Sequence, residues 1–464
     1  MPVGSILERA EDTQDVDIDP AAERRLVWKI DARLMSLAAI FYLLCGLDRS
    51  NIGNARILNS TTHDTLLDST SLTNYEYVIT LQLFFVSYTL CDAPSNLALK
   101  VFKPNIWLGF LVIGCGTISG AMASAKNYAT IAVLRTLLGA FEAGLFPGLI
   151  FFMSFWYKPS ERATRIAVIL CSAILAGGFG GAIAYGVGHI NGARGLEGWR
   201  WLFIIEGVPS VALGFLIILF LPNYPENARW LSEKEVELEM RRLGTNRPHG
   251  AEKLNWEDAK VTLLDGRLWF HYFVYLCLGV GGGSLSLFSP TIVAGLGYHD
   301  LQAQLFTVPP YAVAYVVTLG LAILSDRYKI RGLIAGSCFA VASISFIVQA
   351  SLPATAYAVR YGFLVVSTAG VFGGLPLLCA WVSDNVRNTT AGSLASGLNV
   401  AFTGPGQIIG VWIYRSQDSP AFRLGHGVNA GFLALGSVLS FGLYWHYTQL
   451  NKRLVGTSEP RWIA

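Results

Sequence analysis

Residues 34–55 read LMSLAAIFYLLCGLDRSNIGNA, an apolar run from Leu34 to Leu47 that is followed at once by Asp48 and Arg49. A charged side chain in the hydrocarbon core of a bilayer costs about 2.5 to 3.5 kcal/mol even on lenient insertion scales, so such residues usually face a water-filled cavity. The stretch therefore predicts a membrane helix that serves a transport pathway.

The composition of the whole chain supports a membrane protein. Hydrophobic residues make up 53% of the chain, charged residues make up 14%, and the mean hydropathy is +0.47. Soluble globular domains typically carry about 25% charged residues. The chain is therefore expected to be an integral membrane protein with the lipid bilayer as its environment, and its small net charge of +3 indicates no nucleic-acid partner.

Apolar segments long enough to cross about 30 Å of hydrocarbon recur along the chain. We predict an all-α integral membrane fold with twelve transmembrane helices near residues 34–56, 77–99, 105–124, 128–156, 165–188, 201–221, 268–290, 303–324, 332–351, 357–382, 393–413 and 428–448. The long polar stretch 223–266 divides them six and six. Such a division suggests two six-helix bundles with a substrate site between them near the bilayer midplane.

The predicted domain plan follows from this division. It comprises a disordered N-terminus (1–23), a first bundle (24–222), a central loop (223–266), a second bundle (267–450) and a tail (451–464). In the central loop, Ser232 and Glu235 form a capping-box pattern that opens a charged amphipathic helix through Arg242. Lys and Arg concentrate in segments on one side of the predicted helices, which favours cytosolic termini and loop. We expect a multi-pass monomer in the plasma membrane.

Other chemistry is weakly represented. The seven cysteines fall inside predicted helices with no close pair, so the sequence indicates neither disulfides nor a metal site, and we expect no cofactor. The seven histidines are scattered, with no pairing typical of a metal site or of acid–base catalysis. We therefore do not expect an enzyme and assign no catalytic residues. Asn59-Ser60-Thr61 is a possible glycosylation sequon on the outer side, close to the end of the first helix.

The predicted fourth helix carries two further charges, Arg135 and Glu142, seven residues or about two turns apart. They therefore share nearly the same face, where they could line one cavity. Burial disfavours the charged form of a carboxylate, whereas a nearby arginine favours it. Glu142 and Asp48 are thus candidate proton carriers that respond to an anion at Arg49. The alternative is that both acids only neutralise arginines in a static buried network.

Arg49 also has two interpretations. Its planar guanidinium suits bidentate binding of a carboxylate and stays charged at physiological pH. Alternatively, the helix ends near Leu47, and Asp48 and Arg49 lie in the outer headgroup layer. The small and amide residues of Ser50–Ala55 favour a helix that continues around a polar cavity.

The chain resembles the major facilitator superfamily, and within it the anion:cation symporters, especially the fungal allantoate permease branch. The resemblance is carried by Leu47–Ala55, Pro94-Ser95-Asn96, Arg135–Pro147, Gly198–Gly207, Leu221-Pro222 with Ala228–Leu231, Ser325–Tyr328, Asn399, and Pro420 before Gly425. It covers nearly the whole chain. The loop between the second and third helices departs from the superfamily pattern, because residues 96–103 keep only its basic part.

The resemblance implies an alternating-access carrier and assigns roles to residues. Asp48 and Glu142 would be proton-coupling sites, Arg49 would bind the substrate carboxylate, and Arg135 would switch between acidic partners. Asn399 would hydrogen-bond substrate, although an amide that seals helix packing is equally consistent. Asp326 and Arg327, with Arg331-Gly332, would form a charged latch at an inner gate; the alternative is an ordinary positive-inside cluster.

These observations predict a fungal transporter that imports a small organic anion, such as a carboxylate, a vitamin or an allantoate-like compound, together with protons. An exporter of an acidic secondary metabolite would use the same coupling residues. A nutrient-sensing receptor that no longer transports would use the same binding residues.

Overall fold

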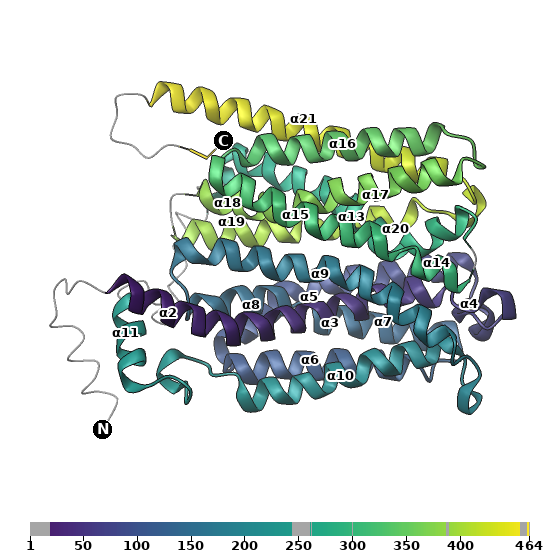
Figure 1. Cartoon of the computed structure of the whole chain (residues 1–464), viewed down its shortest axis with the longest axis horizontal. Coiled ribbons are helices and arrows are strands. Elements are labelled where there is room, and N and C mark those ends of the chain that lie inside the picture. Colours follow the sequence, from purple (N-terminus) through teal and green to yellow (C-terminus); the bar gives the residue numbers. More distant parts are fainter. Residues whose placement is uncertain are drawn as a thin grey trace.

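The computed structural model describes residues 19–243, 260, 262–298, 300–386, 389–454 and 462–463. Long helices run side by side along the longest axis of the molecule (Figure 1), and the described residues contain no strand. Ten helical segments are long and apolar enough to cross a membrane. The predicted all-α membrane fold is therefore confirmed. The helix α5 and the α19–α20 pair coincide with the two remaining predicted spans, 77–99 and 393–413.

The first half supplies six crossings. They are α2 (Pro20–Ile30) continuing through the π-helical η1 (Asp31–Met35) into α3 (Ser36–Ala55), α5 (Asn74–Val101), α6 (Pro104–Met122), α7 (Tyr128–Glu142) with α8 (Leu145–Ser154), α9 (Pro159–Gly188), and α10 (Gly198–Phe220). The short α4 (Leu66–Thr70) lies between the first two crossings.

The second half repeats the plan. Its crossings are α13 (Gly266–Gly295), α14 (Leu301–Leu305) with α15 (Val308–Tyr328), α16 (Arg331–Ser351), α17 (Tyr357–Gly373) with α18 (Leu375–Asp384), α19 (Thr389–Ala401) with α20 (Thr403–Trp412), and α21 (Arg423–Arg453). Figure 1 shows the two halves as two groups of helices, with α9 beside the second half.

Four crossings are interrupted close before a proline. The breaks fall at Gly144, Thr307, Gly374 and Phe402, and Pro147, Pro309, Pro376 and Pro405 follow them in the first turn of the next helix. Proline has no N–H and its ring clashes with the carbonyl of residue i−4, but it is tolerated in the first turn of a helix. The break between α19 and α20 lies next to Gly404-Pro405-Gly406.

The N-terminal boundary needs a correction. Residues 20–23 were expected to be disordered, but they belong to α2, because the Asp19 side chain accepts a hydrogen bond from the Ala21 N–H at 2.9 Å and Pro20 opens the helix. Residues 1–18 lie outside the described residues.

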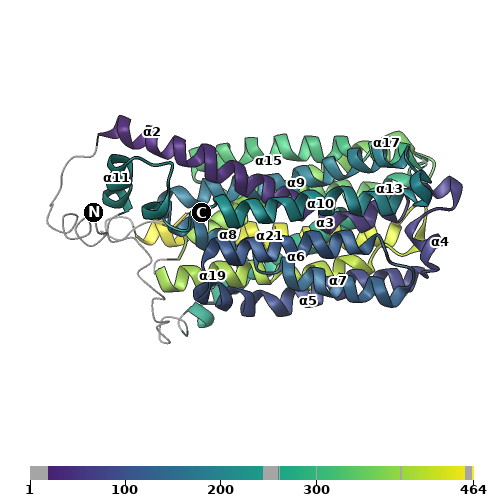
Figure 2. The same ribbon diagram turned by 90° about the horizontal axis from the view of Figure 1, so that it is seen from below.

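In the central loop, the predicted capping box is confirmed. The Ser232 N–H donates to Glu235 at 2.8 Å, and the Glu235 N–H donates back to the Ser232 hydroxyl at 3.3 Å. The helix that follows, α11 (Glu233–Leu243), lies beside α2 (Figure 2) and is tied to it by an ion pair from Lys29 to Glu235 at 2.8 Å. Most of the loop beyond Leu243 lies outside the described residues.

The two ends of the molecule differ in how they join the halves. We call them the α11 end and the α4 end after the helices that lie there (Figure 1). Hydrogen bonds cross between the halves at the α4 end, from Gln304 to the Asn54 carbonyl (3.0 Å), Thr61 to Asp300 (2.6 Å), Arg56 to Ser416 (2.8 Å) and Trp412 to Gln82 (3.1 Å). The described residues of the two halves show no hydrogen bond or ion pair between them at the α11 end.

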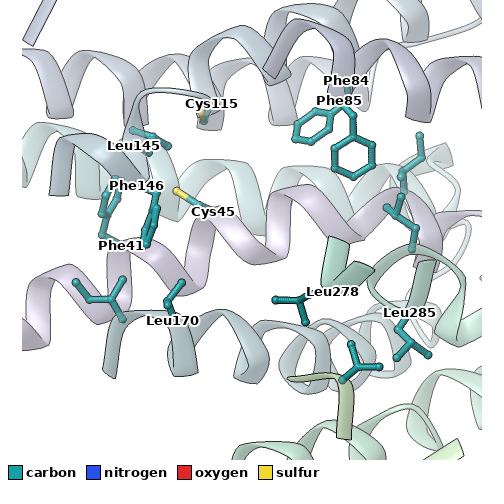
Figure 3. Packing of buried hydrophobic residues seen from close by; sticks show 14 of the residues in the cluster. Phe41, Cys45, Phe84, Phe85, Cys115, Leu145, Phe146, Leu170, Leu278 and Leu285 are labelled. Atoms are coloured by element: carbon teal, nitrogen blue, oxygen red, sulfur yellow. The ribbon is translucent and has the colours of Figure 1, made fainter. Parts of the chain in front are cut away.

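Apolar packing encloses the middle of α3. Phe41 and Cys45 on α3 lie beside Leu145 and Phe146 of α8, and Leu278 on α13 approaches from the second half (Figure 3). This packing covers part of the α3 surface with hydrocarbon side chains, where an unpaired charge would be costly.

Candidate functional site

A cavity of about 1070 Å³ lies between the two halves, counted to where it opens to solvent. It is lined by residues from both halves: Tyr42, Cys45, Gly46, Arg49, Ser50, Tyr88, Glu142, Phe146, Leu170, Ala173, Ile174 and Gly177 from the first, and Tyr275, Leu278, Gly279, Gly282, Ser286, Tyr311, Phe372, Leu375, Val400, Thr403 and Gln407 from the second. A cavity at the interface between two helical bundles is a common place for a small-molecule site.

Arg49 and Glu142 form an ion pair in the cavity wall. Arg49 donates from Nε at 2.8 Å and from Nη2 at 2.5 Å, both to Glu142 Oε1. The Arg49 side chain is 21% exposed and that of Glu142 is 4% exposed. The guanidinium carbon lies 5.1 Å from the centroid of the Tyr88 ring. The expectation that the first helix continues beyond Leu47 is confirmed, because Arg49 lies inside α3.

Arg135 occupies a different position from the one its spacing suggested. It is 1% exposed and does not line the cavity, so the expectation that Arg135 and Glu142 line one cavity is wrong. Its Nη1 donates to the Arg49 carbonyl at 3.5 Å, while Nε and Nη2 have no partner. Two turns of helix separate the two residues by about 10 Å along the axis. Glu142 lines the cavity, whereas Arg135 contacts the backbone of Arg49.

Asp48 points away from the cavity. It is 1% exposed, and its Oδ2 accepts a hydrogen bond from Ser210 on α10 at 3.3 Å, while its Oδ1 has no partner. Successive residues of a helix differ by about 100° in direction, so Asp48 and its neighbour Arg49 must face different helices. The two candidate proton carriers, Asp48 and Glu142, therefore lie on different sides of α3.

A third buried acid in the first half, Glu206, was not assigned a role from the sequence. It lies on α10, is 3% exposed, and accepts a short hydrogen bond from the Asn51 amide of α3. The signal that would have found it is the one used for Asp48, an ionisable residue inside an apolar helix.

Asn399 and the predicted latch lie outside the cavity lining. Asn399 on α19 is 1% exposed, its Oδ1 has no partner, and its neighbour Val400 lines the cavity instead.

In the predicted latch, Asp326 pairs with Arg331 at 3.1 Å, and Arg331 also pairs with Asp384 at 2.7 Å. Arg327 is exposed and lies outside this cluster. The cluster lies within the second half.

The possible glycosylation site Asn59 is buried in the folded structure. Asn59 is 5% exposed, has a positive φ of 57°, and its Nδ2 donates to the Gly188 carbonyl at 3.1 Å. This nitrogen is the atom that would carry a glycan, so the glycosylation of Asn59 stays a prediction that the burial of its side chain disfavours.

The seven cysteines are free, and the described residues contain no group of three or more His, Cys, Asp or Glu side chains arranged to hold a metal ion.

Two helical bundles around a central cavity, with a charged pair in its wall, define a membrane transport protein. The model of the Major Facilitator Superfamily matches residues 38–411, and the chain belongs to that family.

Among curated proteins, the MFS transporter prlL of Fungal sp. (strain NRRL 50135) is 50% identical over 441 residues, covering 94% of this chain and 89% of the relative. The high-affinity nicotinic acid transporter of Saccharomyces cerevisiae is 30% identical over 435 residues, covering 93% of this chain and 79% of the relative. The relatives support a membrane transporter.

Solved structures share the fold at low identity. A bacterial homologue of the human lysosomal transporter Spinster, in an inward-facing and unoccupied conformation, matches with a TM-score of 0.67 and 15% identity, covering 90% of this chain and 98% of that chain. The xylose transporter XylE from E. coli matches with a TM-score of 0.63 and 13% identity, covering 88% and 96%.

Proposed function

We propose that this chain is a secondary active transporter that carries a small organic anion across the membrane together with protons. The observation that carries the proposal is the Arg49–Glu142 ion pair in the wall of the cavity between the halves. An arginine that lines such a cavity is suited to bind a carboxylate in two parallel hydrogen bonds.

The pair couples an anion to a proton by competition. While Glu142 is ionised, it occupies both the Nε and Nη2 donors of Arg49. A proton on Glu142 removes the charge that attracts the guanidinium, and Arg49 can then bind the carboxylate of a substrate. Substrate binding leaves Glu142 without a cation, and a buried carboxylate without a cation costs several kcal/mol, so the substrate favours the protonated acid. Proton and anion therefore bind together.

In the proposal, Asp48 and Arg135 take part in the same exchange of protons and ion-pair partners, outside the cavity lining. Asp48 has an unpartnered Oδ1 and is a second proton-coupling group in the proposal. Arg135 has two unpartnered nitrogens in the same buried region. These free donors suit it to switch between acidic partners as protons arrive and leave.

Alternating access follows from the difference between the two ends. In the structure, the halves are hydrogen-bonded to each other at the α4 end. We assign the α11 end to the cytosol, because the charged segments next to it carry many Lys and Arg residues. The arrangement is then inward-facing, in a multi-pass protein of the plasma membrane that works as a monomer.

The lining favours a small monocarboxylate. Arg49 is the one basic residue of the lining, so a second carboxylate on the substrate would find no cation there. Tyrosine and phenylalanine side chains form much of the remaining wall. The yeast relative named for nicotinic acid, a small carboxylate, is consistent with this substrate class.

The test is uptake of a labelled carboxylate panel by proteoliposomes, with and without an inward proton gradient. One acid should accumulate only with the gradient, and Arg49→Ala and Glu142→Gln should both abolish that accumulation. Arg327→Gln serves as the control, because this exposed arginine lies outside the lining. Accumulation that needs an outward gradient would support export of an acidic metabolite. Accumulation that survives in both variants would reject the assigned roles.

A further inference from the structure

Glu206 and Asn51 face each other in a buried contact that the proposed transport cycle does not use. Asn51 is 0% exposed and Glu206 is 3% exposed, and neither lines the cavity. The Asn51 Nδ2 donates to Glu206 Oε2. On each side of this contact one acceptor is left without a partner, Oδ1 of Asn51 and Oε1 of Glu206.

Among the described residues, the helices packed against α10 offer Glu206 no free positive charge. α10 packs against α6, α3 and α9. Residues 104–122 of α6 and 166–188 of α9 contain no Asp, Glu, Lys or Arg. On α3, Arg49 is committed to Glu142, and the remaining ionisable side chain is Asp48, which is another acid. On α10 itself, Arg200 binds Glu197 and the carbonyls of Ala123 and Ala125.

The unpartnered oxygens are also buried from bulk solvent. The α6 and α10 backbones approach so closely at Gly116 and Gly207 that a Cβ on either glycine would lie 2.7 Å from the carbonyl oxygen of the other. An ionised Glu206 would therefore be a buried carboxylate beside a second acid, with one amide as its only compensation. Such an arrangement is among the most costly in a protein interior.

A proton on Glu206 would account both for the two unpartnered oxygens and for the lack of a positive charge beside the acid. We propose that Glu206 is a proton-binding site, where the acid holds its proton on Oε1 and donates it to Asn51 Oδ1. The two side chains then form a closed pair with two hydrogen bonds, one in each direction, and both unpartnered acceptors are satisfied.

The pair has a positioning role. Asn51 lies three residues after Asp48, so both face α10, where Ser210 lies one turn after Glu206. The proton on Glu206 thus fixes α3 against α10 next to the Asp48-Arg49 segment. Glu206 is a positioning residue that acts through α3, and its proton differs from those exchanged at Asp48 and Glu142.

Glutamine at position 206 provides a sharp test, because its amide reproduces both hydrogen bonds at any pH. Its Oε1 accepts from Asn51 Nδ2, and its Nε2 donates to Asn51 Oδ1. The full-length protein in lipid nanodiscs would be compared with Glu206→Gln and with Glu206→Leu, which has similar size but keeps neither bond. The readouts are thermal unfolding across pH and the infrared C=O band of protonated carboxylic acids.

We expect the wild-type melting temperature to fall as the pH rises, because unfolding releases a proton that the folded state retains. Glu206→Gln should be at least as stable and should lose part of this decline, whereas Glu206→Leu should be less stable at every pH. The infrared spectrum should lose one carboxylic-acid band in Glu206→Gln. If Glu206→Leu does not fold, the proposal is still tested by the carboxylic-acid band and by the melting temperature of Glu206→Gln across pH.

The proposal is overturned if the spectra of wild-type protein and Glu206→Gln share the same carboxylic-acid bands, or if Glu206→Gln is as unstable as Glu206→Leu. Neither readout requires a substrate. A failure of the transport assay and a failure of this inference are therefore distinguishable.

Discussion

The two halves of the molecule share one helical plan but hold their charges in different places. In the described residues of the first half, the buried acids and arginines Asp48, Arg135, Glu142 and Glu206 lie within the membrane helices. The described residues of the second half bury Arg331 at the start of α16 and Arg360 near the start of α17, together with two histidines, His271 and His426.

The second half contributes mostly uncharged side chains to the cavity. Tyr311 is an example, since its hydroxyl donates to the Leu285 carbonyl at 3.0 Å and its ring forms part of the wall. Charged side chains of the cavity wall are thus concentrated in the first half, while the second half supplies a largely uncharged wall. Substitutions in the two halves should therefore differ in kind: coupling should change in the first half and stability or gating in the second.

The largest effect is expected where the halves touch. A Cβ at Gly53 on α3 would overlap the Leu287 carbonyl oxygen of α13. Gly53→Ala should therefore push the halves apart at the α4 end, at a cost of about 1 to 3 kcal/mol, which shifts the balance between two arrangements by about 5- to 150-fold. Spin labels at the exposed positions His63 and Gln302 would report the separation.

The matched control is Gly186→Ala on α9, where a Cβ meets open space. It should leave both the label distance and uptake unchanged. Equal label distances in Gly53→Ala and the wild type would mean that the α4 end does not depend on this contact.

Much of the first half could be predicted from the sequence, because a charge in an apolar helix is visible without a structure. Asp48, Arg49 and Glu142 were found this way, and the helices overlap the predicted spans. The direction of each side chain could not be predicted. Whether Asp48 or Arg49 faces the cavity depends on how α3 is rotated against α10 and α13, and the pattern of this helix, apolar all round, does not fix that rotation.

The environments of other residues depend on contacts between distant parts of the chain. Asn59 looked like an accessible sequon, but its amide is bound by Gly188, which lies 129 residues away. Tyr311 and Phe372 resemble ordinary aromatic residues of apolar helices, and only the packing of the two halves places them around the cavity. Sequence periodicity carries no information about such neighbours.

A second prediction sharpens the role of the first half. Arg49→Lys keeps the positive charge but loses the planar fork. If the substrate carboxylate is bound by two parallel hydrogen bonds, the loss of one charged hydrogen bond should weaken binding by about tenfold or more. The measurement is the apparent affinity for uptake in proteoliposomes, with Arg327→Lys as the control at an exposed arginine. Full wild-type transport by Arg49→Lys would reject bidentate binding and leave a simple charge requirement.

The smallest effect is expected in the second half, at the cluster of Asp326, Arg331 and Asp384. Arg331 is 5% exposed, and its Nε lies 2.7 Å from Asp384, whose side chain is 24% exposed. Asp384→Asn should lower the free energy of unfolding by about 1 kcal/mol. This loss is smaller than is usual when a charged hydrogen-bond partner is removed, because Asp326 still neutralises Arg331.

This variant also tests the comparison between the halves. Because Asp384 lies outside the cavity lining, Asp384→Asn should keep proton-driven accumulation at the wild-type level while its melting temperature falls. Arg327→Gln should change neither quantity, since Arg327 is exposed and outside the cluster. If Asp384→Asn instead lost proton coupling at unchanged stability, charge chemistry would extend into the second half, and Asp384 would have to act in the transport cycle rather than in packing.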